Sequence, residues 1–291
     1  MRDLPDLAGL DAWLAANEAA VPGLRPNCEK RIIWAGEPGA RTGTALVFMH
    51  GFSASPEEIR PVPDRVAAAL GANLHFTRFT GHGQDGPALA RATLDAWRAD
   101  VAEALAIGRA LGERVLVMGC STGCTLSTLA VVEGAEIAGL IHVSPNYRLA
   151  SLLAQFVLDA PGARVWGPWV AGRERSFDVI SEAHEAYWTT RYPTVALFPM
   201  GAAMRTARAA DLSRVKTPAL VVYSPKDEVV SPAAIRAIMA RWGGAVKAHE
   251  VACGPEDDAM CHLIAGDIFS PGQTEGVVDV MIRWARGIGA A

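Results

Sequence analysis

The sequence has few features of an exported, membrane-spanning or nucleic-acid-binding protein. No apolar run approaches the roughly 18 residues that a membrane-spanning helix needs. The N-terminus carries acidic residues from Asp3 onward and lacks the basic-then-apolar order of a signal peptide. The formal net charge is -4, and no lysine or arginine run offers a polyanion a basic surface. We therefore expect a cytoplasmic protein with no integral membrane association and no nucleic acid partner.

Cysteine is also scarce, with five residues in the chain. An odd number in a long chain without an export signal favours reduced thiols over a disulfide framework. Cys120 and Cys124 are four positions apart, but tetrahedral zinc sites usually show more closely paired ligands. We predict no metal and no cofactor, and we interpret Cys120 as a small buried side chain.

What the sequence does contain is the composition of an ordered globular protein, with 291 residues of which 51% are hydrophobic and 20% charged. Short aliphatic runs alternate with helix-like stretches, which indicates a mostly parallel sheet flanked by helices. The predicted strands lie in residues 31–36, 44–52, 73–79, 114–119, 138–145 and 218–224.

Two stretches fit helices that connect such strands. Residues 55–71 begin with Ser55 as a cap and Pro56 in the first turn, and they end at Gly71. Residues 93–112 carry apolar side chains at helical spacing and also end in glycine.

The strand pattern is interrupted between residues 146 and 211, where helical pieces and aromatic residues replace it. We interpret residues 146–211 as an inserted lid subdomain. Residues 1–145 and 212–291 then form the core domain, and residues 1–28 form an N-terminal helical extension outside the sheet.

The most informative stretch runs from residue 114 to residue 134. An apolar run leads directly into Gly-Cys-Ser-Thr-Gly, and a helix-like run follows. A sharp turn from strand to helix needs small flanking residues and exposes the Ser121 hydroxyl above the sheet. The helix N-terminus also favours negative charge nearby. The alternative is that Ser121 merely caps the helix, but the preceding strand favours a nucleophile.

A serine nucleophile needs a base and a group that orients the base, in the order acid then histidine along the chain. Asp227 follows the predicted strand 218–224, and His262 lies in a loop before the last helix-like stretch. The alternatives are a turn or helix-capping role for Asp227 and an ordinary surface or core position for His262. The order of the motifs favours Asp227 as the acid and His262 as the base.

Two N–H groups should stabilise the oxyanion that forms during acyl transfer. We expect them at Thr122, directly after the nucleophile, and at Phe52, in the loop after the strand 44–49. His50 is a second candidate base, but its position before Gly51 favours a structural role in holding this loop.

Together these motifs resemble the α/β-hydrolase superfamily, and within it the carboxylesterases and monoacylglycerol lipases. The resemblance runs from about residue 44 onward through HGF, FTGHGQDG, GCSTG, SPKDEVV and CHLIAGD. It implies an α/β-hydrolase fold with a mainly helical lid. It also implies a nucleophile, a base, an acid and two oxyanion donors at Ser121, His262, Asp227, Phe52 and Thr122. Cys120 departs from the family, which often has a bulkier residue there, and residues 1–28 have no counterpart that we recognise.

The resulting hypothesis is a serine hydrolase that cleaves small carboxylic esters with apolar acyl or aryl groups through an acyl-enzyme. Acyl transfer and carbon–carbon bond hydrolysis use the same residues, and a low-turnover ligand receptor is a further alternative. No substrate-binding residue and no oligomeric state is predicted. The lid is expected to pack its own core and to line part of an apolar pocket, with candidates at Phe156, Trp166, Trp169, Tyr187, Trp188 and Phe198.

Overall fold

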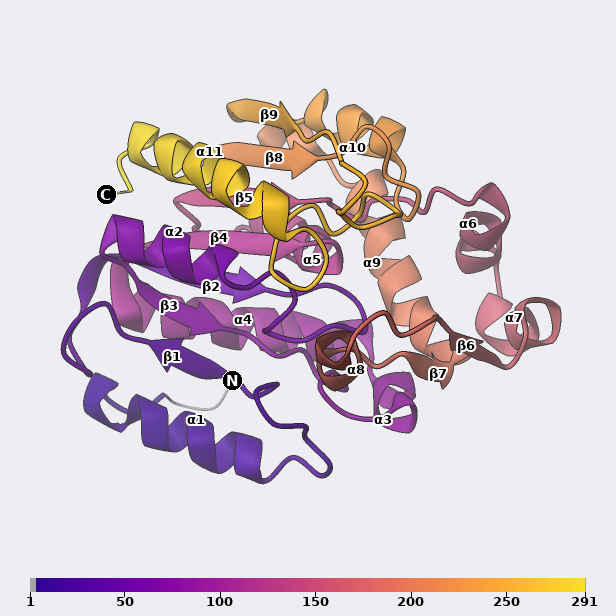
Figure 1. Cartoon of the computed structure of the whole chain (residues 1–291), viewed down its shortest axis with the longest axis horizontal. Coiled ribbons are helices and arrows are strands. Elements are labelled where there is room, and N and C mark those ends of the chain that lie inside the picture. The colour runs from indigo at the N-terminus through magenta and orange to yellow at the C-terminus, as the bar shows by residue number, and fades with distance from the viewer. Residues whose placement is uncertain (1–3, 291) are drawn as a thin grey trace.

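The computed structural model describes residues 4–290, and within them a seven-stranded sheet lies between helices on both faces (Figure 1). The strand at one edge, β1, runs antiparallel to its neighbour, and all other neighbouring strands run parallel. This arrangement confirms the predicted mostly parallel α/β fold. In spatial order the strands are β1 (Arg31–Ile33), β3 (Asn73–Phe76), β2 (Thr42–Met49), β4 (Gly112–Cys120), β5 (Gly139–Val143), β8 (Ala219–Tyr223) and β9 (Val246–Glu250).

Each of the six strands predicted from aliphatic runs is present, but β9 was not predicted. Its sequence, Val-Lys-Ala-His-Glu, is mostly polar, and it lies at the edge of the sheet beside β8. Edge strands of natural proteins often carry charged side chains, which discourage pairing with other molecules. Because β9 lacks an apolar run, the sequence pattern did not predict it.

Alternation along the central strands assigns helices to the two faces. Leu46 and Phe48 pack in one apolar core with helices α2 and α11, whereas Val47 and Met49 pack in the other with α4, α5 and α10. Parallel strands buried on both faces read as continuous apolar runs, which is why they were recognisable. The helices named here are α2 (Val62–Leu70), α4 (Leu94–Leu111), α5 (Thr122–Val132), α10 (Pro232–Met239) and α11 (Thr274–Gly287).

The start of α2 corrects the sequence prediction. The helix does not begin near Ser55, because residues 56–61 form turns and the first helical residue is Val62. Pro61 precedes it, and a proline in a helix interior lacks the N–H that the helix needs and clashes with the preceding turn. The predicted end at Gly71 is confirmed, with a left-handed φ of 59°.

The N-terminal helix α1 (Leu10–Ala19) packs against the outer edge of the sheet. Leu10 and Leu14 share a small apolar cluster with Ile32 of β1. The Glu18 carboxylate also lies 2.6 Å from Nε of Arg78, and both side chains are 6% exposed. A buried ion pair of this kind fixes the position of the helix although it adds little net stability.

Residues 146–211 lie beyond the carboxyl ends of the sheet strands, at the right of Figure 1. The segment is mainly helical, but it also holds a short antiparallel pair, β6 and β7, where the sequence suggested no strand. Its elements are α6 (Leu152–Asp159), α7 (Ala163–Ala171), β6 (Glu174–Ser176), α8 (Glu182–Tyr187), β7 (Arg191–Pro193), η2 (Thr194–Ala196) and α9 (Leu197–Ala209).

The remaining elements are short helices in connecting segments. They are η1 (Leu7–Gly9), α3 (Gly86–Arg91), η3 (Leu212–Arg214) and η4 (Pro271–Gln273). Across residues 4–290, no helix has both the length and the apolar character needed to cross a bilayer.

Candidate active site

Ser121 lies at the turn between β4 and α5, in a strained backbone conformation with φ 49° and ψ -109°. The turn is tight on both sides. A Cβ atom on Gly119 would come within 2.7 Å of the Cys124 nitrogen, and one on Gly123 would collide with the Met49 carbonyl oxygen. Larger residues therefore cannot occupy these two positions without moving the backbone.

The Ser121 side chain does not cap α5, although the residue occupies the N-cap position. Its Oγ atom instead lies 3.1 Å from Nε2 of His262. The capping alternative for Ser121 is therefore wrong, because its hydroxyl is engaged by an imidazole.

His262 completes a chain of hydrogen bonds, since its Nδ1 atom lies 2.8 Å from Oδ2 of Asp227. This network fits the tautomer in which Nδ1–H donates to the carboxylate and Nε2 accepts from the serine hydroxyl. The three side chains come from loops after β4, β8 and β9, which end at the same edge of the sheet. All three residues are at most 9% exposed.

Further hydrogen bonds hold both Asp227 and His262, the partners of the carboxylate–imidazole bond, in place. The second oxygen of Asp227 accepts hydrogen bonds from the N–H groups of Val229 and Val230, at 2.9 and 2.8 Å. Asp258 accepts from the His262 N–H at 2.9 Å, and the Ser144 hydroxyl donates to the His262 carbonyl at 2.6 Å. The imidazole is thus held from its backbone as well as from its ring.

The electrostatic surroundings favour a basic imidazole. Burial lowers the pKa of His262, but the nearby carboxylates of Asp227, Glu58 and Asp258 outweigh burial and raise the pKa above its usual 6.5. An imidazole with these neighbours is stabilised when it takes up a proton from the serine.

The loop after β2 is fixed by His50. Its Nδ1 lies 2.8 Å from the Gly51 carbonyl oxygen, and its Nε2 accepts the Phe79 N–H at 3.1 Å. Burial lowers the pKa of His50 to about 3, so the ring is neutral. His50 therefore has the structural role expected from the sequence.

The hydrogen bond between His50 and the Gly51 carbonyl also sets the direction of the Phe52 N–H. In a planar trans peptide, the N–H of Phe52 points opposite to the Gly51 carbonyl. Thr122 is the first residue of α5, so its N–H has no acceptor within the helix. Phe52 and Ser121 both line the same large cavity.

That cavity has a volume of about 1320 Å³ and extends from Ser121 and His262 to residues of the 146–211 segment. Of the aromatic candidates in that segment, Trp188 and Phe198 line it. Phe156 and Trp169 do not, and they are 66% and 76% exposed. Trp166 and Tyr187 are also absent from its wall, which is instead completed by aromatic residues that the sequence did not single out, namely Phe177, Tyr192 and Phe269.

Residues 46–263 match the alpha/beta hydrolase family. The chain belongs to the alpha/beta hydrolase family. This membership confirms the family predicted from the HGF, GCSTG and CHLIAGD motifs.

One relative of this alpha/beta hydrolase is a thermostable monoacylglycerol lipase of Bacillus sp. (strain H-257). It is 26% identical over 195 residues, which cover 64% of this chain and 72% of the lipase. A solved structure from work on the metagenome-derived lipolytic enzymes LipS and LipT has a TM-score of 0.73 at 22% identity, covering 91% of this chain and 99% of that one. The monoacylglycerol lipase of Paleococcus ferrophilus has a TM-score of 0.63 at 14% identity, covering 90% and 98%. At such identities the two structures show a shared fold.

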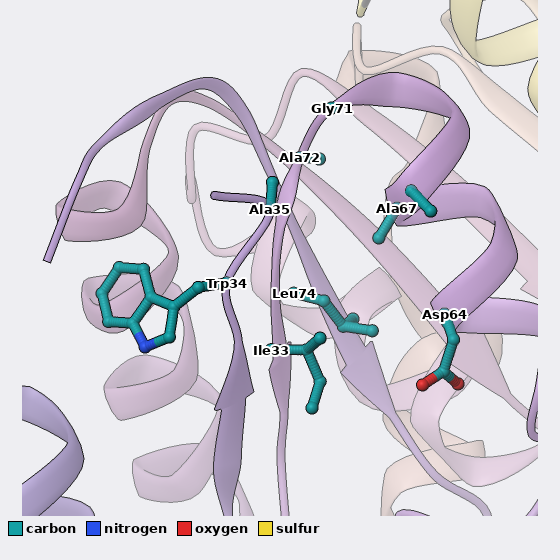
Figure 2. Close-up of a pocket in the computed structure, with 9 residues that line it drawn as sticks. Ile33, Trp34, Ala35, Asp64, Ala67, Gly71, Ala72 and Leu74 are labelled. Carbon is teal, nitrogen blue, oxygen red and sulfur yellow. The ribbon is translucent and has the colours of Figure 1, made fainter. Parts of the chain in front are cut away.

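A second, smaller cavity of this alpha/beta hydrolase lies between β1, β3 and α2 and has a volume of about 200 Å³ (Figure 2). Its walls are mostly apolar, with Ile33 and Leu74 pointing into the space that Ala67 faces from the helix. Its acidic side chain, Asp64, pairs with Arg60 at 2.7 Å. The lining holds no serine, cysteine or histidine, and its carboxylate is engaged by Arg60.

The cysteines near Ser121 are buried and have local partners. The Cys124 thiol lies 3.1 Å from the Gly119 carbonyl oxygen, and Cys120 packs in the core on the α2 and α11 face. Within residues 4–290, no three His, Cys, Asp or Glu side chains are grouped as metal ligands would be.

Two carboxylates of the site were missed from the sequence. Asp258 is not among the predicted site residues, but its carboxylate holds the backbone of the His262 loop. Glu58 falls within the predicted helix 55–71, whereas it lies in a turn and is buried beside Gly51. Pro61, the last residue before α2, was the available signal that the helix begins after Glu58.

Proposed function

We propose that this alpha/beta hydrolase is a carboxylic ester hydrolase with Ser121 as nucleophile, His262 as general base and Asp227 as the orienting acid. The observation that carries the proposal is the continuous hydrogen-bond chain from the Ser121 hydroxyl through His262 to the Asp227 carboxylate. It has the order that serine acyl transfer requires, and its geometry fits the tautomer that this reaction needs. The names of the similar lipases and of the lipolytic enzyme structure support the same reaction class.

In the proposed mechanism, the Ser121 oxygen attacks the ester carbonyl while His262 takes up its proton. The carbonyl oxygen becomes an oxyanion that receives hydrogen bonds from the N–H groups of Phe52 and Thr122. Collapse of this intermediate breaks the bond to the alcohol, and His262 returns the proton to the departing oxygen. Water then attacks the acyl-enzyme with the same base and regenerates Ser121.

The substrate class that we propose is uncharged esters with an apolar acyl group, including monoacylglycerols. The cavity wall is rich in apolar and aromatic side chains, such as Val157 and Phe198. Its acidic residues outnumber its one arginine, Arg175, so a substrate anion would meet mostly negative charge. The acidic residues in the wall are Glu58, Asp178, Glu228, Glu256, Asp257 and Asp258.

We further propose that residues 146–211 act as a lid subdomain over a core formed by residues 1–145 and 212–291. The cavity wall supports this role, because the segment supplies many of the residues that line the cavity together with Ser121. A lid in this position would exclude bulk water from the reacting ester and would limit the length of acyl chain that fits in the cavity.

The experiment that tests this function is a series of p-nitrophenyl and glycerol esters of increasing acyl length. The wild type should hydrolyse the esters with a preferred chain length, and Ser121→Ala should not. If neither series is cleaved, the chain is a ligand receptor. If the acyl group passes to an added alcohol faster than to water, it is an acyltransferase.

A further inference from the structure

Glu58 is a buried carboxylic acid in contact with the loop that carries Phe52. The residue is 3% exposed, and its Oε2 accepts the Gly51 N–H at 2.6 Å. A Cβ atom on Gly51 would lie 2.5 Å from the other carboxylate oxygen of Glu58 and 3.2 Å from Cβ of Ser121. The carboxyl group therefore lies directly behind the Gly51 backbone, on the side of the nucleophile.

This acid has no counterion among the residues that the structure describes. The arginines near its neighbour, Arg31 and Arg60, both pair with Glu57. Burying an unpaired carboxyl group destabilises the fold. If the Gly51 N–H needed only a hydrogen-bond acceptor, a neutral side chain would provide it at a lower cost in stability.

Three ionisable groups on other elements interact electrostatically with Glu58. They are the Cys120 thiol of β4, the Cys124 thiol of α5 and the imidazole of His262. Burial raises the pKa of Glu58 to about 7, although the Gly51 N–H, Cys120 and His262 each lower it somewhat. The coupling is mutual, because Glu58 is one of the groups that raise the pKa of His262.

Gly51 is held from both of its peptide groups. His50 binds its carbonyl oxygen, and Glu58 binds its N–H. The His50 bond holds the peptide that joins Gly51 to Phe52, and the Glu58 bond holds the peptide before it. With the Gly51 backbone held from both sides, the Phe52 N–H keeps its direction. Above its pKa of about 7 Glu58 is charged, and a hydrogen bond to a charged acceptor is the stronger kind, which suits a loop that must not move while charge develops.

We propose that Glu58 is a positioning residue for the reaction: its carboxylate holds the Gly51 N–H, thereby orients the Phe52 N–H toward the oxyanion, and favours the protonated form of His262. The proposal rests on the proposed ester hydrolysis. It assigns to Glu58 two separable effects, one through the hydrogen bond and one through the charge.

The sign of the charge effect follows from the direction of the coupling. His262 acts as a base only when neutral, so activity is lost as pH falls through its pKa. Removing the Glu58 charge removes a group that raises this pKa. The acid limb of kcat/KM should therefore move to lower pH, and the variant should keep a larger share of its activity in mild acid than the wild type.

The test compares Glu58→Gln, Glu58→Ala and the matched control Glu57→Gln by pH profiles of kcat and KM. The amide of Glu58→Gln still offers an oxygen to Gly51, so kcat near pH 8 should stay within about tenfold of wild type while the acid limb moves down. Glu58→Ala removes the hydrogen bond as well, and kcat should fall by roughly 10-fold or more with KM within about threefold. Glu57→Gln should move neither quantity.

An acid limb of Glu58→Gln that coincides with the wild type, or a Glu58→Ala kcat equal to that of the wild type, would overturn the proposal. If Glu58→Ala does not fold, the pH profile of Glu58→Gln decides alone. Ser121→Ala is assayed alongside. An inactive Ser121→Ala with unchanged Glu58 variants rejects this inference only, whereas an active Ser121→Ala rejects the proposed function and this inference with it.

Discussion

The turn around Ser121 and the segment 146–211 face each other across one cavity, yet they are built differently. The first turns of α5 are fully buried, and Ser121 itself is 6% exposed. Across the cavity, Trp169 on α7 is 76% exposed. Several other large apolar side chains of the segment are exposed as well, including Leu152, Leu153, Phe156, Val165, Val170 and Ile180.

The difference in burial corresponds to two roles, which are the reaction at Ser121 and the shaping of the cavity by the segment 146–211. Close packing around Ser121 leaves few alternatives for its backbone, which keeps the proposed catalytic hydrogen bonds in register. The segment 146–211 is made of short elements with exposed apolar surface, and its contribution is the shape and charge of the cavity. We therefore expect substitutions on the first side to change the rate for every substrate, and substitutions on the second side to change the choice among substrates.

The largest effect should come from the proposed nucleophile and base. Ser121→Ala and His262→Ala should each lower kcat for a short p-nitrophenyl ester by roughly 10^3-fold or more, because each removes a group that acts in the transition state. Circular dichroism and thermal unfolding check that the variants stay folded. A loss under tenfold in a folded variant would show that the core side does not set the rate.

Asp227→Asn should have the next largest effect, with kcat lowered by about 10^2- to 10^4-fold through loss of the tautomer that His262 needs. The matched control is Asp257→Asn, because the Asp257 carboxylate accepts from Gly254 and Gln273 and does not contact the imidazole. Equal losses in the two variants would remove Asp227 from the proposed role.

The pH profile adds a second readout for Asp227. Since the carboxylates around His262 raise its pKa above 6.5, wild-type kcat/KM should fall to half at a pH above 6.5. The Asp227→Asn variant loses the largest of these contributions, so its residual activity should decline at lower pH than in the wild type. A shift in the opposite direction would contradict the assigned electrostatics.

On the other side of the cavity we expect altered selectivity with smaller changes in rate. For the wild type, each added methylene should raise kcat/KM by up to roughly tenfold until the cavity is full. The double variant Leu153→Ala, Phe177→Ala changes two residues of the wall and should flatten this series. The double variant Phe156→Ala, Trp169→Ala changes exposed residues outside the wall and should leave it unchanged. The reverse result would place the acyl chain elsewhere.

The smallest effect concerns charge. A neutral ester should be preferred over the same ester with a terminal carboxylate, because the charged residues of the wall are mainly acidic. The double variant Glu228→Gln, Glu256→Gln should reduce the ratio of kcat/KM for the neutral ester to that for the anionic ester by a few-fold. Added salt should have the same effect, because both side chains are exposed and their charges are screened by ions. A wild type that prefers the anionic ester would contradict the proposed substrate class.

The same contrast explains what could be predicted from the sequence. The strand before Ser121 is buried on both sides and therefore continuously apolar, and the glycines beside Ser121 are required by the turn. These features are local, so they can be recognised without the fold. Ser121, Asp227 and His262 could be proposed together because each follows a recognisable strand or motif.

Other features depend on contacts that no local pattern encodes. Glu58 lies in a turn with the composition of a helix start, and its burial results from the approach of Gly51 and Cys120. In the segment 146–211, some aromatic residues line the cavity and others face outward, and both groups consist of the same residue types. Trp188 and Trp169 can be told apart only once the helices are placed.

The most direct test of the central claim is labelling with a fluorophosphonate, which reacts with a serine that a neighbouring base activates. Intact-mass analysis and peptide mapping should find one adduct, at Ser121. Labelling should be absent in Ser121→Ala and at least 10-fold slower in a folded His262→Ala variant. An adduct on another residue, or undiminished labelling of Ser121→Ala, would contradict the assignment of Ser121 as the nucleophile.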